Sequence, residues 1–447
     1  MVRPSTRRFR AGSGRGRFEI HLILSRALLA RESKDAPRRR RESLDPMIPA
    51  LLIFIGTYAV VALGRLPGFR LDRAGAALIG ASLMVGAGVL SLEEAYRAVD
   101  LNTLVLLLGM MILVANLRLA GFFALAAHRV ALHARHPLML LAGIILVSGV
   151  LSAFLVNDTV CLMLTPLVAE LTVGLRRNPV PYLLAVAMAS NIGSTATITG
   201  NPQNIMIGSF SGIPYAEFAA VLSPVAAIGL LLLFALLLLS FRREFLDGAR
   251  LEASLPPPRV RGALLLKSIA ATLLAVACFF AGVAPAKVAI IAGALLLLTR
   301  RLKPERVYRE IDWALLLLFA GLFIVVAGME KAAFTPAVLA AAHRIALDEP
   351  PVLALVAAVL SNIVSNVPTV LVLKPFVAAL ADPERAWLTL AMASTLAGNL
   401  TIVGSVANLI VVERARRLRI EIDFWSYLRI GVPVTLATIA VGVWWMG

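Results

Sequence analysis

The chain has 447 residues, of which 60% are hydrophobic and only 15% are charged. Soluble domains carry about 25% charged residues, so this composition excludes an ordinary soluble protein and predicts an α-helical protein that crosses a membrane many times. The net charge of +17 does not indicate nucleic acid as a partner, because the basic residues stand at the N-terminal end and between apolar segments. The positive-inside rule explains such a distribution, and binding of anionic lipids is the alternative.

Residues 1–46 contain 13 Lys and Arg against 5 Asp and Glu, with no long apolar run. We predict a disordered basic tail, or an upstream extension ahead of a start at Met47. The two cysteines, Cys161 and Cys278, both lie in apolar segments, so no disulfide framework is expected.

Twelve apolar segments follow the tail, and several approach the roughly 20 residues that a helix needs to cross a hydrocarbon core. They span residues 48–65, 75–92, 101–117, 137–156, 181–199, 217–240, 263–283, 285–299, 312–328, 350–364, 386–403 and 427–446. They predict an all-α polytopic membrane protein with about 11–12 transmembrane segments, embedded in a lipid bilayer.

The chain also repeats itself, because three blocks of similar residues occur twice in the same order. The matching pairs are Asp100 with Asp312 and Gly109 with Gly321 at an offset of 212, Ser152 with Ser361 and Asn157 with Asn366 at 209, and Gly200 with Gly404 and Asn204 with Asn408 at 204. We therefore divide the chain into a first half at 47–240, a charged, Pro-rich cytoplasmic linker at 241–262, and a second half at 263–447.

Polar residues interrupt the apolar pattern at matching places in the two halves. Residues 157–159 are polar and Pro166 follows them. The segment 152–176 is too short for two spans, so it predicts a re-entrant hairpin with a polar tip, and residues 361–375 predict a second one. Irregular backbone at membrane depth is tolerated only where it is buried in protein or lines a cavity.

Residues 200–204 read Gly-Asn-Pro-Gln-Asn and break the next apolar segment, because Gly relaxes φ and Pro removes a donor. Residues 404–408 break the second half without a proline. Discontinuous helices in matching positions indicate the binding site of a secondary transporter. Their N-termini suit an anion, and Asn, Thr and free carbonyl groups suit Na⁺. The alternative is that these polar side chains only hold helices together.

These motifs resemble the citrate transporter-like permeases of the ion transporter superfamily, a group that includes the divalent anion:sodium symporters and the membrane subunit of the arsenite pump. The resemblance extends over about residues 48–447. It implies that each half contributes a scaffold part and a mobile transport part. It further implies a homodimer that works by an elevator motion.

The resemblance and the polar blocks together predict the site. We expect a substrate site formed by Asn157, Asp158, Thr159, Gly200, Asn201, Pro202, Asn366, Val367, Pro368 and Gly404. We expect coupling-ion sites formed by Ser152, Asn157, Gly200, Ser361, Asn366 and Gly404. No cofactor is expected, and no metal beyond a coupling sodium.

The symporters carry a Ser-Asn-Thr triplet at each hairpin tip, where this chain has Val-Asn-Asp at 156–158 and Ser-Asn-Val at 365–367. Asp158 is a candidate for binding a cation or a coupling proton, with an ion pair or a helix cap as the alternative. Because Pro202 has no counterpart, we expect Gly200 and Asn201 to matter more for binding than residues 404 and 405.

Charged residues near the segment ends have simpler interpretations. We expect Asp100 and Asp312 to be helix N-caps, and Arg118, Glu330 and Lys331 to be interfacial. Lys374 either attracts the anion or extends to the interface, and the second role is the one we expect.

The topology implied by the resemblance meets one conflict. Inverted halves need an odd number of crossings between the two matching Asp residues, but the apolar segments from 101 to 299 number six. Either 263–283 or 285–299 does not span, or the halves are parallel. Our expectation is the inverted arrangement.

The predicted function is secondary active transport of a small anion, a carboxylate or an inorganic oxyanion, across a bacterial-type inner membrane, coupled to Na⁺ or H⁺. One alternative is an arsenite or antimonite efflux permease, working alone or with a soluble ATPase, since the chain has no P-loop of its own. The other is a cation/proton antiporter that uses Asp158. An enzyme is not expected, because neither a His-Glu-x-x-His motif nor a nucleophile elbow occurs.

Overall fold

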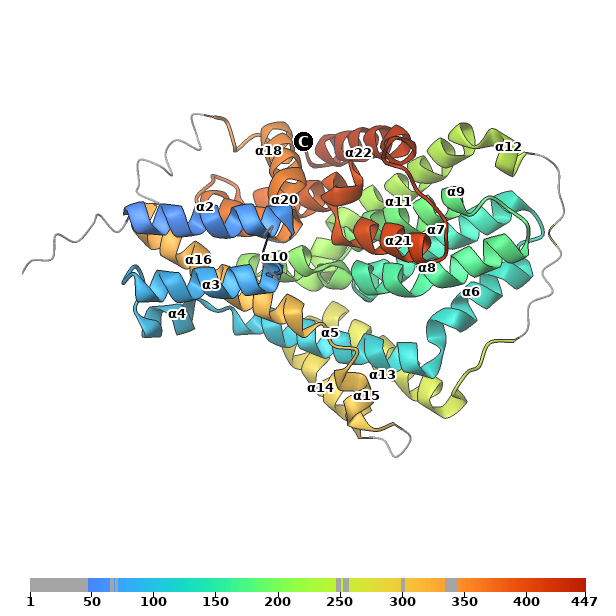
Figure 1. Ribbon diagram of the computed structural model, residues 1–447, viewed down its shortest axis with the longest axis horizontal. Coiled ribbons are helices and arrows are strands. Elements are labelled where there is room, and N and C mark those ends of the chain that lie inside the picture. Colours follow the sequence, from blue (N-terminus) through green and yellow to red (C-terminus); the bar gives the residue numbers. More distant parts are fainter. Residues whose placement is uncertain are drawn as a thin grey trace, which may run out of the picture. The chain divides into compact units, whose positions relative to one another are not determined.

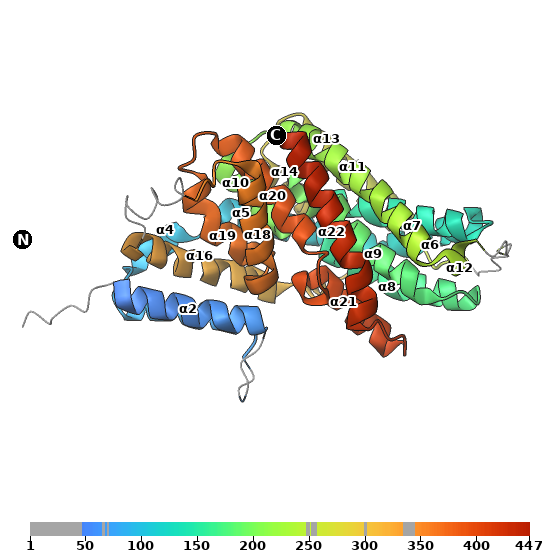
Figure 2. The same cartoon turned by 90° about the horizontal axis from the view of Figure 1, so that it is seen from above.

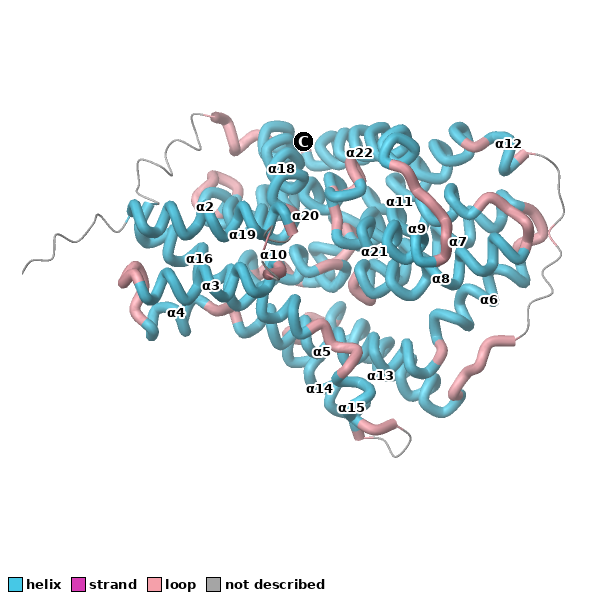
Figure 3. Tube along the Cα trace, in the orientation of Figure 1, coloured by secondary structure: helices cyan, strands magenta, loops and turns pink. Residues whose placement is uncertain are grey.

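We describe the protein from a computed structural model that covers residues 47–64, 68, 71–246, 251, 257–298, 302–333 and 345–447. All regular structure in these ranges is helical (Figures 1 and 3), as the composition predicts. The predicted basic tail at residues 1–46 lies outside the described residues, as do residues 247–250 and 252–256 of the predicted linker.

Apart from α6, the helices of the first half recur in the same order among the described residues of the second half, so the repeat predicted from the sequence is present in the fold. The first half comprises α2 (Met47–Leu63), α3 (Arg73–Gly86), α4 (Leu92–Ala98), α5 (Leu101–Ala120), α6 (Phe122–His133), α7 (Pro137–Phe154), α8 (Asn157–Gly174), α9 (Pro179–Ser194), the 3₁₀ turn η1 (Ile198–Gly200), α10 (Pro202–Ser211) and α11 (Tyr215–Ser240). After the short α12 (Arg242–Phe245), the second half comprises α13 (Gly262–Phe280), α14 (Pro285–Leu297), α15 (Pro304–Tyr308), α16 (Trp313–Ala333), α18 (Pro350–Val364), α19 (Asn366–Val377), α20 (Pro383–Ala397), η2 (Ile402–Gly404), α21 (Val406–Arg417) and α22 (Phe424–Met446).

Side-chain caps fix where several helices begin. Asp100 accepts hydrogen bonds from the Asn102 backbone N–H (3.0 Å) and the Thr103 hydroxyl (2.7 Å), and Asp312 accepts one from the Leu315 N–H (3.0 Å). Both predicted N-caps are therefore confirmed. They satisfy N–H groups that have no partner inside the helix.

Helices of one half pack on helices of the other. In the first half α5 packs on α14 of the second, and α16 of the second half packs on α3 of the first (Figure 1). Glycines allow both contacts. A Cβ at Gly109 would lie 2.5 Å from the Ala289 carbonyl carbon, and a Cβ at Gly321 would lie 2.6 Å from that of Ala77. Since Ala77 and Ala289 also differ by 212, the repeat extends into the helices that precede the two aspartate caps.

The equivalent helices α5 and α16 run in opposite directions. Arg118, in the last turn of α5, forms an ion pair with Glu310, just before α16 begins. Lys331, in the last turn of α16, forms an ion pair with Glu94, shortly before α5 begins (2.7 Å). Hydrogen bonds from Lys331 and Ser91 lower the pKa of Glu94 to about 2, so this pair stays charged at neutral pH. The two halves are therefore inverted relative to each other.

The helices α7 and α8 form the first hairpin. The Asn157 side-chain amide donates to the side-chain oxygen of Asn191, and the Cys161 thiol contacts the backbone carbonyl of Val186. These two contacts show that α8 runs antiparallel to α9. Gly149 lies directly against Gly193, so α7 runs parallel to α9. The hairpin therefore consists of both α7 and α8, and the predicted boundary at residue 152 was too late by about four helical turns.

This hairpin removes the conflict in the crossing count. Among the described residues, six helices are long and apolar enough to cross a membrane, and five shorter apolar helices accompany them. One of the long ones is α7, which returns through α8 instead of crossing. The crossings from α5 to α14 then number five: α5, the α9–α10 pair, α11, α13 and α14. The expectation that 263–283 or 285–299 fails to span stays a prediction: α13 is one of the six long helices, and α14, with 13 residues, is one of the five shorter ones.

Candidate functional site

Both hairpin tips have the same unusual backbone. Val156 has φ 55° and Ser365 has φ 80°, a left-handed conformation that non-glycine residues rarely adopt. Each is followed at once by the asparagine that starts the returning helix, Asn157 in α8 and Asn366 in α19. Strain at equivalent positions of a repeat marks a functional constraint.

The two helix breaks are closed in the same way. The Asn204 side-chain amide donates to the carbonyl oxygens of Ser194 (3.1 Å) and Thr197 (3.0 Å). Its counterpart Asn408 donates to those of Gly398 (2.6 Å) and Thr401 (3.0 Å). These carbonyls stand at the ends of α9 and α20, where a helix leaves acceptors without partners. The asparagines thus stabilise the breaks themselves.

Asn191 connects the two halves at the centre of the protein. Its side-chain oxygen accepts from Asn157 (3.0 Å) and from the Ser405 hydroxyl (3.1 Å). Its amide donates to the side-chain oxygens of Asn399 (2.9 Å) and Asn408 (3.0 Å). A buried hydrogen-bonded network of this kind fixes one arrangement of the helices that carry it.

A small polar cavity lies where the first turns of four helices meet. The helices are α8, α10, α19 and α21, and α2, α3 and α16 close the cavity from the side. The lining residues are Val61, Arg73, Asn157, Asp158, Pro202, Gln203, Leu315, Leu318, Ser365, Asn366, Val367, Pro368, Ser405 and Val406. The cavity has a volume of about 50 Å³, which suits a solute of a few non-hydrogen atoms.

The electrostatics of the cavity favour an anion without being strongly positive. A helix N-terminus carries about half a positive charge, and four of them converge here. The charged side chains on the wall are Arg73 and Asp158, and their charges interact. The helix ends provide further positive potential.

The structure brings together six of the ten predicted substrate-binding residues. Those on the cavity wall are Asn157, Asp158, Pro202, Asn366, Val367 and Pro368. Those that do not line it are Thr159, Gly200, Asn201 and Gly404. Asn201 is fully buried and caps α10 by accepting from the Asn204 N–H (2.8 Å), while its amide donates to Thr395 (3.2 Å).

Ser405, the counterpart of Asn201, does line the cavity. The geometry therefore argues against our expectation that residues 200 and 201 matter more for binding than residues 404 and 405. The two breaks present different residues to the cavity: Pro202 and Gln203 from the first, and Ser405 and Val406 from the second.

Four side-chain oxygen atoms of the residues predicted to hold a coupling ion are buried. Within the part of the chain that the structure describes, they have no hydrogen-bond partner. They are Ser152 Oγ, Asn157 Oδ1, Ser361 Oγ and Asn366 Oδ1. The serines are 0% and 1% exposed. A buried oxygen without a partner is costly, so this set fits a small cation that needs oxygen ligands.

Besides Ser365 of the hairpin triplet, three polar or charged cavity residues were missed in the sequence. Arg73 follows an apolar segment and there resembles an ordinary loop charge, so only its place on the cavity wall, together with the hairpin tip, distinguishes it. Gln203 stands inside the break motif, next to the residues that we selected, and Ser405 matches Asn201 in the repeat. The last two could have been found by applying the repeat to every polar residue of the breaks.

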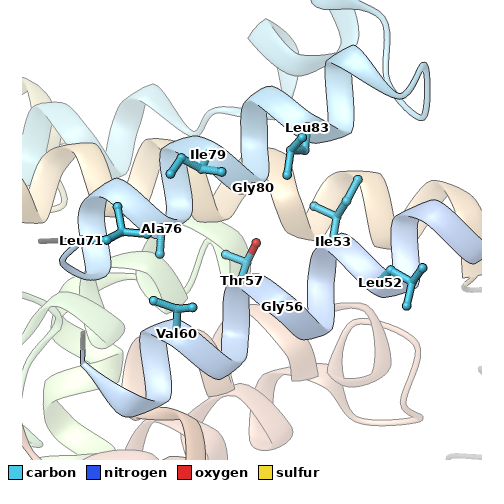
Figure 4. Close-up of a pocket in the computed structure, with 10 residues that line it drawn as sticks. All are labelled: Leu52, Ile53, Gly56, Thr57, Val60, Leu71, Ala76, Ile79, Gly80 and Leu83. Carbon is cyan, nitrogen blue, oxygen red and sulfur yellow. The ribbon is translucent and has the colours of Figure 1, made fainter. Parts of the chain in front are cut away.

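Larger cavities elsewhere lack charged groups. A cavity of about 660 Å³ lies between α2 and α3 (Figure 4), and apart from Thr57 its lining side chains are apolar or absent. Another, of about 470 Å³, lies between α5, α10 and the α13–α14 connection. Neither offers an ion the charges and converging helix ends of the central cavity.

Two inverted halves, with paired hairpins and paired helix breaks around one polar cavity, define a membrane transport protein. The chain belongs to the citrate transporter family, whose model matches residues 51–397. The predicted recognition of a citrate transporter-like permease is thereby confirmed, and the protein is a multi-pass membrane transporter.

The chain is similar along nearly its whole length to other membrane proteins. It is 32% identical to the 46 kDa membrane protein of Mycobacterium leprae (strain TN) over 420 residues, which cover 88% of this chain and 96% of that protein. It is 29% identical to the silicon efflux transporter LSI3 of Oryza sativa subsp. japonica over 473 residues, with 90% and 98% covered. Its fold resembles that of the Alcanivorax borkumensis YdaH transporter, with a TM-score of 0.57 at 14% identity, over 90% of this chain and 97% of that one.

Proposed function

We propose that this protein is a secondary active transporter of a small anion, a carboxylate or an inorganic oxyanion, in a bacterial-type inner membrane. The observation that carries the proposal is the convergence of four helix starts on one polar cavity between the two halves. Free N–H groups and aligned backbone dipoles bind anions without any cofactor. The amide groups of Asn157 and Asn366 at the hairpin tips supply two further donors.

We further propose that the transport is coupled to Na⁺, with H⁺ as the alternative. The four unpartnered oxygens of residues 152, 157, 361 and 366 support Na⁺, because oxygen ligands suit hard cations. Ser152 and Asn157 belong to the first half, and Ser361 and Asn366 are their counterparts in the repeat. The carbonyl groups of Gly200 and Gly404 are the further ligands that this proposal requires.

An elevator motion is the mechanism that we propose for alternating access. The helices from α7 to α11 and from α18 to α22 carry the hairpins, the breaks and most of the cavity wall, and would move together. The helices α2–α5 and α13–α16 exchange partners between the halves and would stay fixed. We propose a homodimer joined through this fixed part.

Uptake into proteoliposomes tests the function. We expect flux of a carboxylate or oxyanion that depends on an imposed Na⁺ gradient and falls at least tenfold in the Asn157→Ala and Asn366→Ala variants. Ser152→Ala should weaken the dependence on Na⁺, whereas Ser148→Ala is the matched control, since Ser148 is equally buried one turn earlier in α7. Absence of gradient-dependent flux for every anion tested would rule the proposal out.

A second candidate is efflux of a metalloid oxygen acid such as arsenite or antimonite, by this chain alone or with a soluble ATPase. The small cavity favours it over a large carboxylate such as citrate, and a relative is named as a silicon efflux transporter. Expression in a strain that lacks its own arsenite exporter would test it. Resistance that persists without any ATPase partner would favour a transporter that works alone.

A cation/proton antiporter on the same fold needs a carboxylate that exchanges protons at the site. Asp158 is the one carboxylate on the cavity wall within the described residues. If Asp158→Asn leaves both the rate and the pH profile of transport unchanged, this alternative is excluded.

A further inference from the structure

Arg73 reaches the central cavity from outside the hairpins and helix breaks. It is the first residue of α3, and Asp72 fixes this helix start by accepting from the Gly75 N–H (2.8 Å). The Arg73 side chain passes beside Gly64, at the end of α2. Within the described part of the chain it has no hydrogen bond or ion pair, so its donors remain available to a solute.

Asp158 faces the same cavity from the second position of α8. A carboxylate in the first turn of a helix interacts favourably with the helix dipole. No described residue donates a hydrogen bond to it, and the charges of Arg73 and Asp312 both act on it. An ionised carboxylate can only accept, so it repels a fully ionised oxyanion and attracts an O–H group.

Both residues depart from the repeat. The position equivalent to Arg73, at the offset of 212 that relates Ala77 to Ala289, is Pro285. The position equivalent to Asp158, at the offset of 209, is Val367. The pair therefore belongs to one side of the cavity only, and the general architecture of two inverted halves does not require it. A role of the pair in selecting the solute explains why two charged side chains lie on this side of the cavity.

We propose that Arg73 and Asp158 are specificity-determining residues that select a small oxygen acid still carrying at least one O–H. The acid presents an acceptor oxygen to the Arg73 guanidinium and donates its O–H to the Asp158 carboxylate. The helix starts and the hairpin asparagines bind the remaining oxygens. This inference rests on the proposed function and narrows its substrate class, because sulfate and simple dicarboxylates such as succinate have no O–H at neutral pH.

Competing probes of similar shape test the inference directly. Phosphate, arsenite and silicate keep an O–H at pH 7, whereas sulfate and succinate do not. Binding to purified protein is read as the rise in melting temperature, and uptake by proteoliposomes is read separately. We expect the wild type to prefer at least one of the first three probes over both of the others. A site built to bond an O–H rejects analogues without one by a large factor.

The variants separate the two roles. Asp158→Asn should lower the preference for the acid with an O–H over sulfate at least tenfold, since an amide also donates. Arg73→Gln should weaken binding of both probes, and Arg73→Lys should restore part of it. Arg97→Gln is the control, because the Arg97 side chain is exposed and paired with Glu93. Each variant is compared by its elution profile to exclude misfolding.

Two results would overturn the inference. One is a wild type that prefers sulfate or succinate to all three acids with an O–H. The other is an Asp158→Asn variant that folds and keeps the original preference. Either result leaves the proposed function standing if gradient-driven flux persists, whereas loss of all flux and all binding in the wild type removes both.

Discussion

At the scale of single residues, the conspicuous polar positions of the chain have two different tasks. Asn204 and Asn408 close the helix breaks, whereas Asn157 and Asn366 each keep a buried oxygen without a partner beside the cavity, among the described residues. The sequence predicted that these asparagines are special, because they interrupt apolar helices in pairs. It could not separate the two tasks, because that depends on which carbonyl groups end up within reach.

Gly200 and Gly404 provide a prediction at this scale. A Cβ at Gly200 would overlap the backbone carbonyl of Ser194, whereas a Cβ at Gly404 would meet the Asn362 side-chain oxygen at 2.7 Å. A side chain moves more easily than a backbone. We expect Gly200→Ala to destabilise the protein by about 1–3 kcal/mol, the usual cost of overpacking, and Gly404→Ala to cost less. The melting temperatures of the two purified variants measure the difference. Equal losses would mean that the backbone at residue 194 can adapt.

At the scale of helices, α19 of the second hairpin packs against α16. The Lys374 ammonium lies 3.5 Å from Glu330 on α16 and 5.0 Å from the ring centroid of Phe210 on α10. The Tyr58 hydroxyl on α2 also donates to the Pro368 carbonyl (3.3 Å). The sequence placed Glu330 and Lys374 at an interface with water, because nothing along the chain shows that two residues 44 apart face each other.

Loss of the Glu330–Lys374 pair should weaken the contact between α16 and α19. Partly exposed pairs contribute about 0.2–1 kcal/mol, so the population of the arrangement described here should fall by up to about fivefold. The yield of a cross-link between cysteines at positions 58 and 368, formed by a short bifunctional thiol reagent, reports this population. We expect Glu330→Gln to lower the yield, and Lys331→Gln to leave it unchanged, because Lys331 pairs with Glu94 instead. An unchanged yield in both variants would show that the pair does not hold α19 in place.

At the scale of the whole molecule, the inverted arrangement follows from the opposite directions of α5 and α16. It also gathers most of the basic segments on one side of the membrane, as the positive-inside rule requires. The described parts of these segments are residues 118–136, 174–178, 241–246, 257–261, 302–309 and 413–419. The helical fold and the repeat could be predicted from the sequence. The crossing count could not, since the 18 residues of α7 are long enough to span and only their contact with α9 shows that they return.

Single cysteines at equivalent positions test the inversion. Glu93 in α4 and Glu305 in α15 are both exposed and differ by 212. In a background without Cys161 and Cys278, a reagent that does not cross the membrane is applied to the Glu93→Cys and Glu305→Cys variants. We expect it to label the first variant from outside and the second only from the cytoplasmic side. Labelling of both variants from the same side would show that the halves are parallel.

The central claim is that the cavity formed by the first turns of α8, α10, α19 and α21 is the transport site. The most direct measurement is an experimental structure of the protein with a transported solute bound. We predict that the solute contacts Asn157 and Asn366 at the hairpin tips and lies within reach of Arg73. A solute bound instead between α2 and α3, or between α5 and α10, would contradict the account.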